Sequence, residues 1–103
     1  MILTARRVSA AEGKELGFVA EVTKPEDLMA TARTWAKGIC ELGPMSIRAS
    51  KEAVYRGLDE PSLEAAMKGQ NQYPAIAALY RSEDFVEGPL AFSQKRAPQW
   101  KGR

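Results

Sequence analysis

The sequence contains no histidine, and this absence removes the side chain that most often acts as a general base near neutral pH. It contains one cysteine, Cys40, so neither an intrachain disulfide nor a Cys–His pair can form. A metal ion would find only oxygen ligands, and no calcium-loop spacing is present. We therefore expect no metal site, and we expect Cys40 to be buried beside the apolar stripe of its helix.

Long apolar runs, Gly-rich phosphate loops and a strong charge imbalance are also lacking. No apolar stretch approaches the ~20 residues that a membrane span needs, and the N-terminus does not have the pattern of a signal peptide. The net charge of +2 gives little general attraction to nucleic acid or acidic lipid. A lone cysteine fits a reducing compartment. We expect a cytoplasmic protein without membrane or nucleic-acid partners.

Amphipathic helical patterns occupy most of the 103 residues, and no region is rich in strand signals. The length suffices for one domain. The predicted fold class is therefore all-α, a small orthogonal bundle of about four to six helices in a single domain over residues 1–103.

Capping residues and prolines predict where these helices begin and end. A capping box from Ser9 to Glu12 predicts a short helix that ends near Gly17. Pro25 predicts the start of a second helix, which carries Trp35 as a core or interface anchor and stops by residues 43–44.

Three further helical segments follow. The third is predicted over residues 45–58 with a core stripe of Ile47, Val54 and Leu58. The fourth starts with Pro61 near its first helical position and is split or kinked at Pro74. The last is capped by Ser82, broken at residues 88–89 and followed by an irregular tail after residue 98.

Acidic residues are frequent, but none forms a convincing general acid and base pair. Glu83, Asp84 and Glu87 lie in the first turns of the last helix, where interaction with the helix dipole suffices to explain them. We therefore expect no catalytic residue in this chain.

The tail combines four basic residues with aromatic ones and has no acid in its last nine positions. Such a patch can bind a phosphate and stack on a base. It would suit the 3′-phospho-ADP end of coenzyme A or a single nucleic-acid strand. The plainer alternative is a solvated terminus, because charge runs usually face water.

Several segments, in order and spacing, resemble the C-terminal region of the enoyl-CoA hydratase/isomerase (crotonase) family. They read LT.RR.SA.E...LG.V..V from residue 3, P..I...KEAV..GL from residue 44, and SED..EG..AF..KR.P.WKGR from residue 82. The resemblance implies the helical part that packs on an αβ core and builds a trimer interface. It also implies that the core, with the oxyanion hole and the acid–base carboxylates, is absent from this chain.

The resemblance further implies that Phe92 and Lys95 contact the coenzyme A of a neighbouring subunit, with the lysine on the 3′-phosphate and the phenylalanine near the adenine. Acyl-CoA would be a substrate of the intact homo-oligomer, and no further cofactor is implied. We expect the chain alone to be inactive. The alternative is a stand-alone helical protein-interaction module, whose apolar faces bind a copy of itself or another protein.

Overall fold

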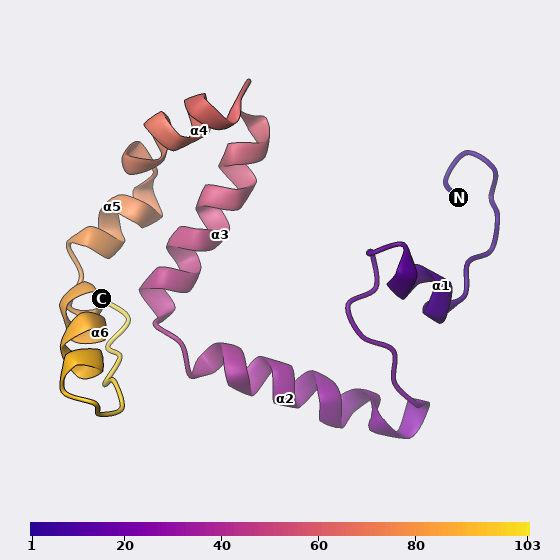
Figure 1. Ribbon diagram of the computed structural model, residues 1–103, viewed down its shortest axis with the longest axis horizontal. Helices are drawn as coiled ribbons and strands as arrows, with labels where there is room; N and C mark the ends of the chain where they lie inside the picture. The colour runs from indigo at the N-terminus through magenta and orange to yellow at the C-terminus, as the bar shows by residue number, and fades with distance from the viewer. The chain divides into compact units, whose positions relative to one another are not determined.

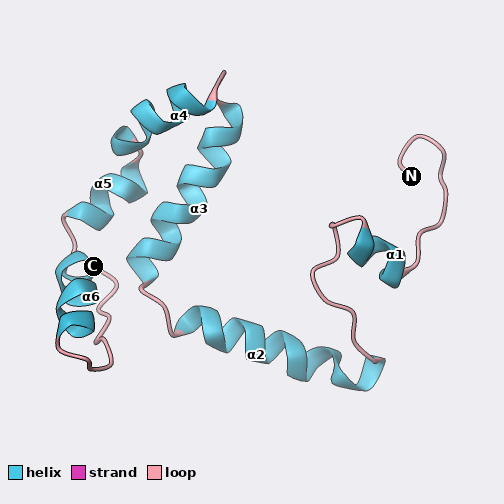
Figure 2. Cartoon of the chain, viewed as in Figure 1, coloured by secondary structure: helices cyan, strands magenta, loops and turns pink.

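The capping residues and prolines of the sequence delimit the helices of the computed structural model, which describes residues 1–103 (Figure 1). Its α-helices are, in chain order, α1 Ala10–Glu15, α2 Leu28–Cys40, α3 Pro44–Asp59, α4 Leu63–Gly69, α5 Pro74–Tyr80 and α6 Glu83–Ser93. Short 3-10 turns precede α2 at Pro25–Asp27 and follow α4 at Gln70–Gln72. Figure 2 shows helices and loops without any strand, which confirms the all-α prediction.

Three serines cap their helices through side-chain oxygens. The caps at Ser9 and Ser82 are those that the sequence predicts, whereas Pro61, predicted near the first helical position, precedes the cap at Ser62. The hydroxyls of Ser9, Ser62 and Ser82 each accept a backbone N–H three residues further on. The capping box at Ser9 is only half formed, because the Glu12 carboxylate accepts from Arg6 at 2.7 Å instead of returning to Ser9. Pro74 begins α5, so the predicted split between the fourth and fifth helices is confirmed.

The chain divides into two compact units, Met1–Lys37 and Gly38–Arg103. In the first unit α1 ends in a Schellman motif with Gly17 in the left-handed region at φ +84°, and the Phe18 amide donates to the Gly13 carbonyl. Only Gly13 is buried in this unit. The role of residues 1–103 as one C-terminal domain stays a prediction.

The second unit has its core where α3 meets α5. Ala49, Tyr73 and Ile76 are buried there, and Ala53 and Leu79 pack against them. The Glu52 carboxylate accepts the backbone N–H of Ala75 at 2.6 Å, which satisfies an unpaired amide at the start of α5. This polar contact fixes the N-terminus of α5 against the middle of α3.

The predicted core stripe of α3 is wrong. Val54 and Leu58 are exposed to 63% and 78%, whereas Met45 and Ala49 are buried. The small side chains at positions 49 and 53 let α5 approach closely, so α3 turns that face inward. Val54 and Leu58 line an open groove of about 520 Å³ together with Leu63, Ala66 and Met67 of α4 and with Gln70, which follows α4.

The predicted break at residues 88–89 is also wrong, because α6 continues through Pro89 to Ser93. A proline normally pushes the preceding residue out of the helical region through a clash that involves the preceding Cβ. The preceding residue here is Gly88, which has no Cβ. The missing donor of Pro89 falls on an exposed face of the helix, so α6 tolerates the proline.

Candidate functional site

Lys95 and Phe92, the two residues that the sequence singled out, lie together at the C-terminal end of α6. The Lys95 amide donates to the Phe92 carbonyl at 3.1 Å, and the Arg96 amide donates to the Ala91 carbonyl at 3.1 Å. These two bonds form a Schellman motif, which requires a left-handed residue at its turn. Lys95 takes that position with φ 53°. A lysine there costs about 1–2 kcal/mol relative to a right-handed conformation.

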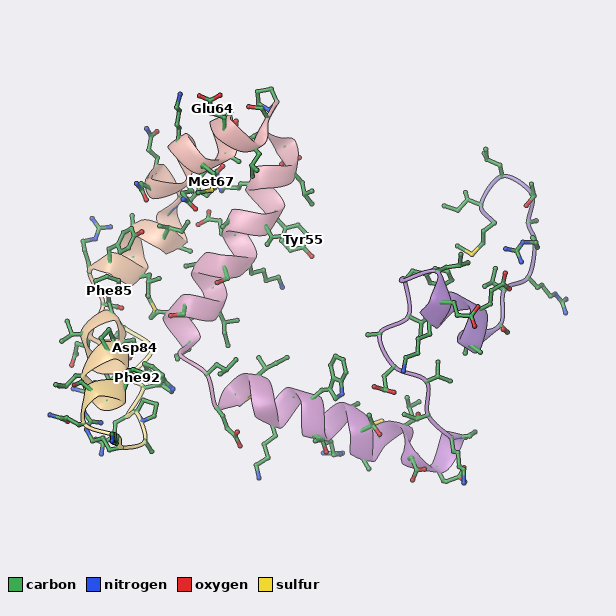
Figure 3. All side chains as sticks on the ribbon, viewed as in Figure 1. Tyr55, Glu64, Met67, Asp84, Phe85 and Phe92 are labelled. Carbon is green, nitrogen blue, oxygen red and sulfur yellow. The ribbon has the colours of Figure 1, made fainter.

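Both side chains are open to solvent. The Phe92 side chain is 87% exposed, and Figure 3 shows it at the end of α6 nearest the tail. Lys95 is exposed as well. The arrangement presents a free aromatic face and a cation three residues apart, at a helix end where positive charge is favoured. This pair can bind a phosphate and an adjacent flat ring.

Ion pairs distinguish Lys95 from the other basic residues of the tail. Arg96 binds Glu87 through two parallel hydrogen bonds of 2.5 and 2.8 Å. Lys101 and Arg103 both pair with Glu83. No carboxylate lies within ion-pair distance of Lys95, so it is the one tail cation whose charge is not neutralised within the chain.

The last eight residues, 96–103, lie along α6 and are called the C-terminal strap below. Asp84, only 4% exposed, accepts the amide of Lys101 at 2.7 Å and that of Gly102 at 3.0 Å. Glu87 accepts the amide of Gln99 at 2.6 Å. The strap is irregular, as predicted, yet side-chain carboxylates of α6 satisfy its backbone donors.

Trp100 anchors the strap at its centre. Its indole N–H donates to the Glu41 carbonyl at 3.1 Å, in the turn before α3. The ring also lies over two glycines: an added Cβ would stand 3.4 Å from the ring at Gly43 and 3.3 Å from it at Gly88. The strap thereby joins the start of α3 to the middle of α6.

These contacts change the acidity of the carboxylates on α6. The hydrogen bonds from Arg96, and next the N–H of Gln99, lower the pKa of Glu87 to about 2. The Lys101 ammonium lowers the pKa of Glu83, through its hydrogen bond first and its charge second. Both carboxylates therefore stay ionised well below neutral pH.

The sequence indicates the helix-end pair but not the strap. From the sequence, the acids of α6 are expected to interact with the helix dipole, and a solvated tail is one alternative, whereas Glu83, Asp84 and Glu87 bind that tail. A signal in the sequence is that three acids within five residues of one helix precede a tail with four cations and no acid. The sequence pattern does not show that the chain returns along α6, because this depends on contacts between residues distant in sequence, such as Lys101 with Asp84 and Trp100 with Glu41.

The predicted burial of Cys40 is wrong, because Cys40 is exposed. Trp35 is 52% exposed, so it does not anchor a core, and its alternative role as an interface anchor stays a prediction. Both belong to α2, in which no residue is buried. The apolar stripe of α2 is thus present in the sequence, but none of its residues is buried.

No other feature of the chain suggests a reactive centre. No three Cys, Asp or Glu side chains come together as a potential metal site. The helices are all too short or too polar to cross a membrane. A second open groove of about 590 Å³ is lined mainly by apolar residues around Trp100, among them Ile39, Leu42 and Ile47.

Comparison with known proteins identifies the family to which the chain belongs. The model of the enoyl-CoA hydratase/isomerase family matches residues 1–103, and the chain belongs to this family. It is 39% identical to carnitinyl-CoA dehydratases of Proteus mirabilis (strain HI4320) and Escherichia coli (strain K12). These matches cover 100% of the chain and 40% of each relative, so the chain spans about two fifths of their length.

Solved structures of enoyl-CoA hydratases support the same family assignment. An enoyl-CoA hydratase from Bacillus anthracis is 35% identical with a TM-score of 0.86, over 99% of this chain and 38% of that one. An enoyl-CoA hydratase/isomerase from Mycobacterium paratuberculosis is 32% identical with a TM-score of 0.85, over 95% and 37% respectively. The family resemblance of the sequence is therefore confirmed.

Proposed function

We propose that this chain is the helical C-terminal domain of an acyl-CoA enzyme that adds water to the double bond of 2-enoyl-CoA thioesters. Residues 1–103 would pack on an N-terminal αβ core. The core would supply the oxyanion hole and the acid–base carboxylates. Support comes from family membership and from similar proteins named enoyl-CoA hydratase that are more than twice as long. The single cysteine supports a cytoplasmic location.

Within that enzyme, Phe92 and Lys95 contact the 3′-phospho-ADP end of coenzyme A. One observation carries this assignment: Lys95 is the tail cation without a carboxylate partner, and it sits beside the most exposed aromatic residue of the chain. A phosphate can pair with its ammonium without displacing an existing ion pair. The adenine ring can lie on the free face of Phe92.

A binding comparison tests this assignment directly. Coenzyme A and 3′-dephospho-coenzyme A are titrated into the isotope-labelled chain, and NMR chemical shifts give both dissociation constants, even in the millimolar range. We expect coenzyme A to bind more tightly. Lys95→Ala should weaken coenzyme A about five- to tenfold, or about 1–1.4 kcal/mol, and leave the dephospho form unchanged.

The matched control is Lys37→Ala, which removes the same charge from an exposed position in α2. It should alter neither constant by more than the general effect of net charge. Equal affinity for the two ligands in the unaltered chain would refute the phosphate contact of Lys95.

The uncovered apolar faces support a role in oligomer contacts, as expected of this region. No residue of α2 is buried, and Leu28, Met29, Trp35 and Ile39 are all more than half exposed. Such a stripe needs a covering surface. In the proposed enzyme, the αβ core and neighbouring subunits cover it.

The same faces favour the second candidate, a stand-alone interaction module. Sedimentation of the purified chain separates the two. A discrete dimer or trimer with stable helicity supports the module, whereas a weakly folded, heterogeneous sample supports a domain that depends on its core.

A further inference from the structure

Glu87 binds the strap at Arg96 and Gln99, and Arg96 directly follows Lys95 in the chain. Its carboxylate is 17% exposed and receives three hydrogen bonds, two from Arg96 and one from the backbone of Gln99. Parallel bonds between a guanidinium and a carboxylate fix the orientation of both groups. Glu87 therefore determines where the residue next to Lys95 lies.

Arg96 connects Glu87 to the residues on either side of Lys95. Besides Glu87, its side chain donates to the Gln94 side chain at 2.7 Å and to the Ala97 carbonyl at 3.1 Å. The residues on both sides of Lys95 are thus tied to one guanidinium. A lysine has no intrinsic preference for the left-handed region, so this network must hold it there.

We propose that Glu87 is a positioning residue for Lys95. By holding Arg96 and the Gln99 amide, it fixes Lys95 in the left-handed turn at the end of α6, beside Phe92. Glu87 also neutralises the charge of Arg96, so that Lys95 is the cation that remains available to bind a phosphate. This inference rests on the proposed coenzyme A contact and names a residue that the resemblance did not imply.

The test compares two double variants with the same net charge as the unaltered chain. Glu87→Gln with Arg96→Gln removes the restraint on Lys95 but leaves Lys95 itself in place. Glu83→Gln with Arg103→Gln breaks the ion pairs of Glu83 with Arg103 and with Lys101, neither of which touches Arg96. Both loosen the strap, so a merely structural role predicts the same effect on ligand binding from each.

The main readout is the ratio of the dissociation constants for 3′-dephospho-coenzyme A and coenzyme A. We expect the Glu87/Arg96 variant to lower this ratio at least threefold and the Glu83/Arg103 variant to leave it unchanged. A ligand-free readout accompanies it: the amide–Hα coupling and Cα shift of Lys95 should leave their left-handed values only in the Glu87/Arg96 variant.

Arg96→Lys serves as a milder variant, which keeps the charge but cannot form two parallel hydrogen bonds. It should lower the ratio by a smaller factor. If either Arg96 variant keeps helical circular dichroism and the ratio of the unaltered chain, the positioning role is overturned. An unaltered chain that does not distinguish the two ligands overturns the coenzyme A contact as well, so the two failures are distinguishable.

Discussion

Lys95 illustrates how a single residue can be favourable for a ligand and unfavourable for the fold. Its φ of 53° belongs to a position where helices usually end in glycine. The ammonium has no ion-pair partner in the chain, so no salt bridge offsets the backbone cost. This combination is typical of residues kept for binding.

Glycine at this position should therefore stabilise the chain. We expect Lys95→Gly to raise the free energy of unfolding by about 0.5–1 kcal/mol, because glycine adopts the left-handed region without a Cβ clash. Lys95→Ala removes the same charge but retains the Cβ, and should change stability by less than about 0.5 kcal/mol. Urea unfolding followed by circular dichroism measures both. Equal stabilities of the glycine and alanine variants would contradict the strained conformation.

Among the elements, α6 lacks one backbone hydrogen bond at Pro89 but continues as a helix past it. Pro89 cannot donate to the Phe85 carbonyl, yet the helix runs on for four more residues. Gly88 makes this possible and also leaves room for the Trp100 ring. The local sequence favours a break, but the packing of the strap favours one continuous helix.

Replacing the proline should restore the missing hydrogen bond. We expect Pro89→Ala to raise the free energy of unfolding by about 1–3 kcal/mol, since Pro89 is exposed and its removal leaves no cavity. Pro74→Ala is the control, because Pro74 is the first residue of α5 and replaces no bonded donor. A loss of stability in Pro89→Ala would show that the proline is required by the fold.

The strap should make the stability of the second unit depend on pH in acid. The pKa of Glu87 is about 2 in the folded chain and near 4.5 when unfolded, so the carboxylate stabilises the fold fully above pH 4.5. This contribution is lost as the pH falls from 4.5 through 2. We expect the free energy of unfolding to fall over that window and Glu87→Gln to flatten the fall.

Urea unfolding at intervals from pH 5 to 2 measures this slope. Glu64→Gln is the matched control: its ion pair with Lys68 is about three quarters exposed on both sides, and such pairs contribute little. If Glu87→Gln and Glu64→Gln give the same pH profile as the unaltered chain, the strap carboxylate does not stabilise the fold.

The whole molecule buries little of its apolar surface. Five apolar residues are buried, and α2 contributes none of them. Figure 3 shows Tyr55 of α3 and Met67 of α4, which are 64% and 59% exposed. A chain with so small a core is marginally stable, and a surface that covers the open faces would stabilise it.

At this scale we expect the purified chain to be inactive. It has no histidine and no cluster of acidic residues in a shielded pocket, and its proposed function places the catalytic groups on a separate core. The measurement is the loss of the conjugated thioester absorbance of crotonyl-CoA at high protein concentration. Turnover above the buffer rate, retained through repurification, would contradict the proposal.

Most helix boundaries follow from the sequence alone, because caps and prolines act on the backbone within a few residues. Ser9 and Ser82 cap as expected and Pro74 begins a helix as expected, whereas the break expected at residues 88–89 is absent. The sequence also supplied the helix-end pair, Phe92 and Lys95, through its resemblance to a family.

Contacts between residues distant in sequence determine which helix faces are covered and which charged side chains lack an ion-pair partner. Apolar periodicity marks a face but cannot say what lies against it, so Val54, Leu58 and Cys40 are exposed despite their pattern. In the same way, the sequence does not show which of the four cations in the tail form ion pairs. Three are neutralised because the chain returns along α6, and contacts between residues distant in sequence leave Lys95 as the exception.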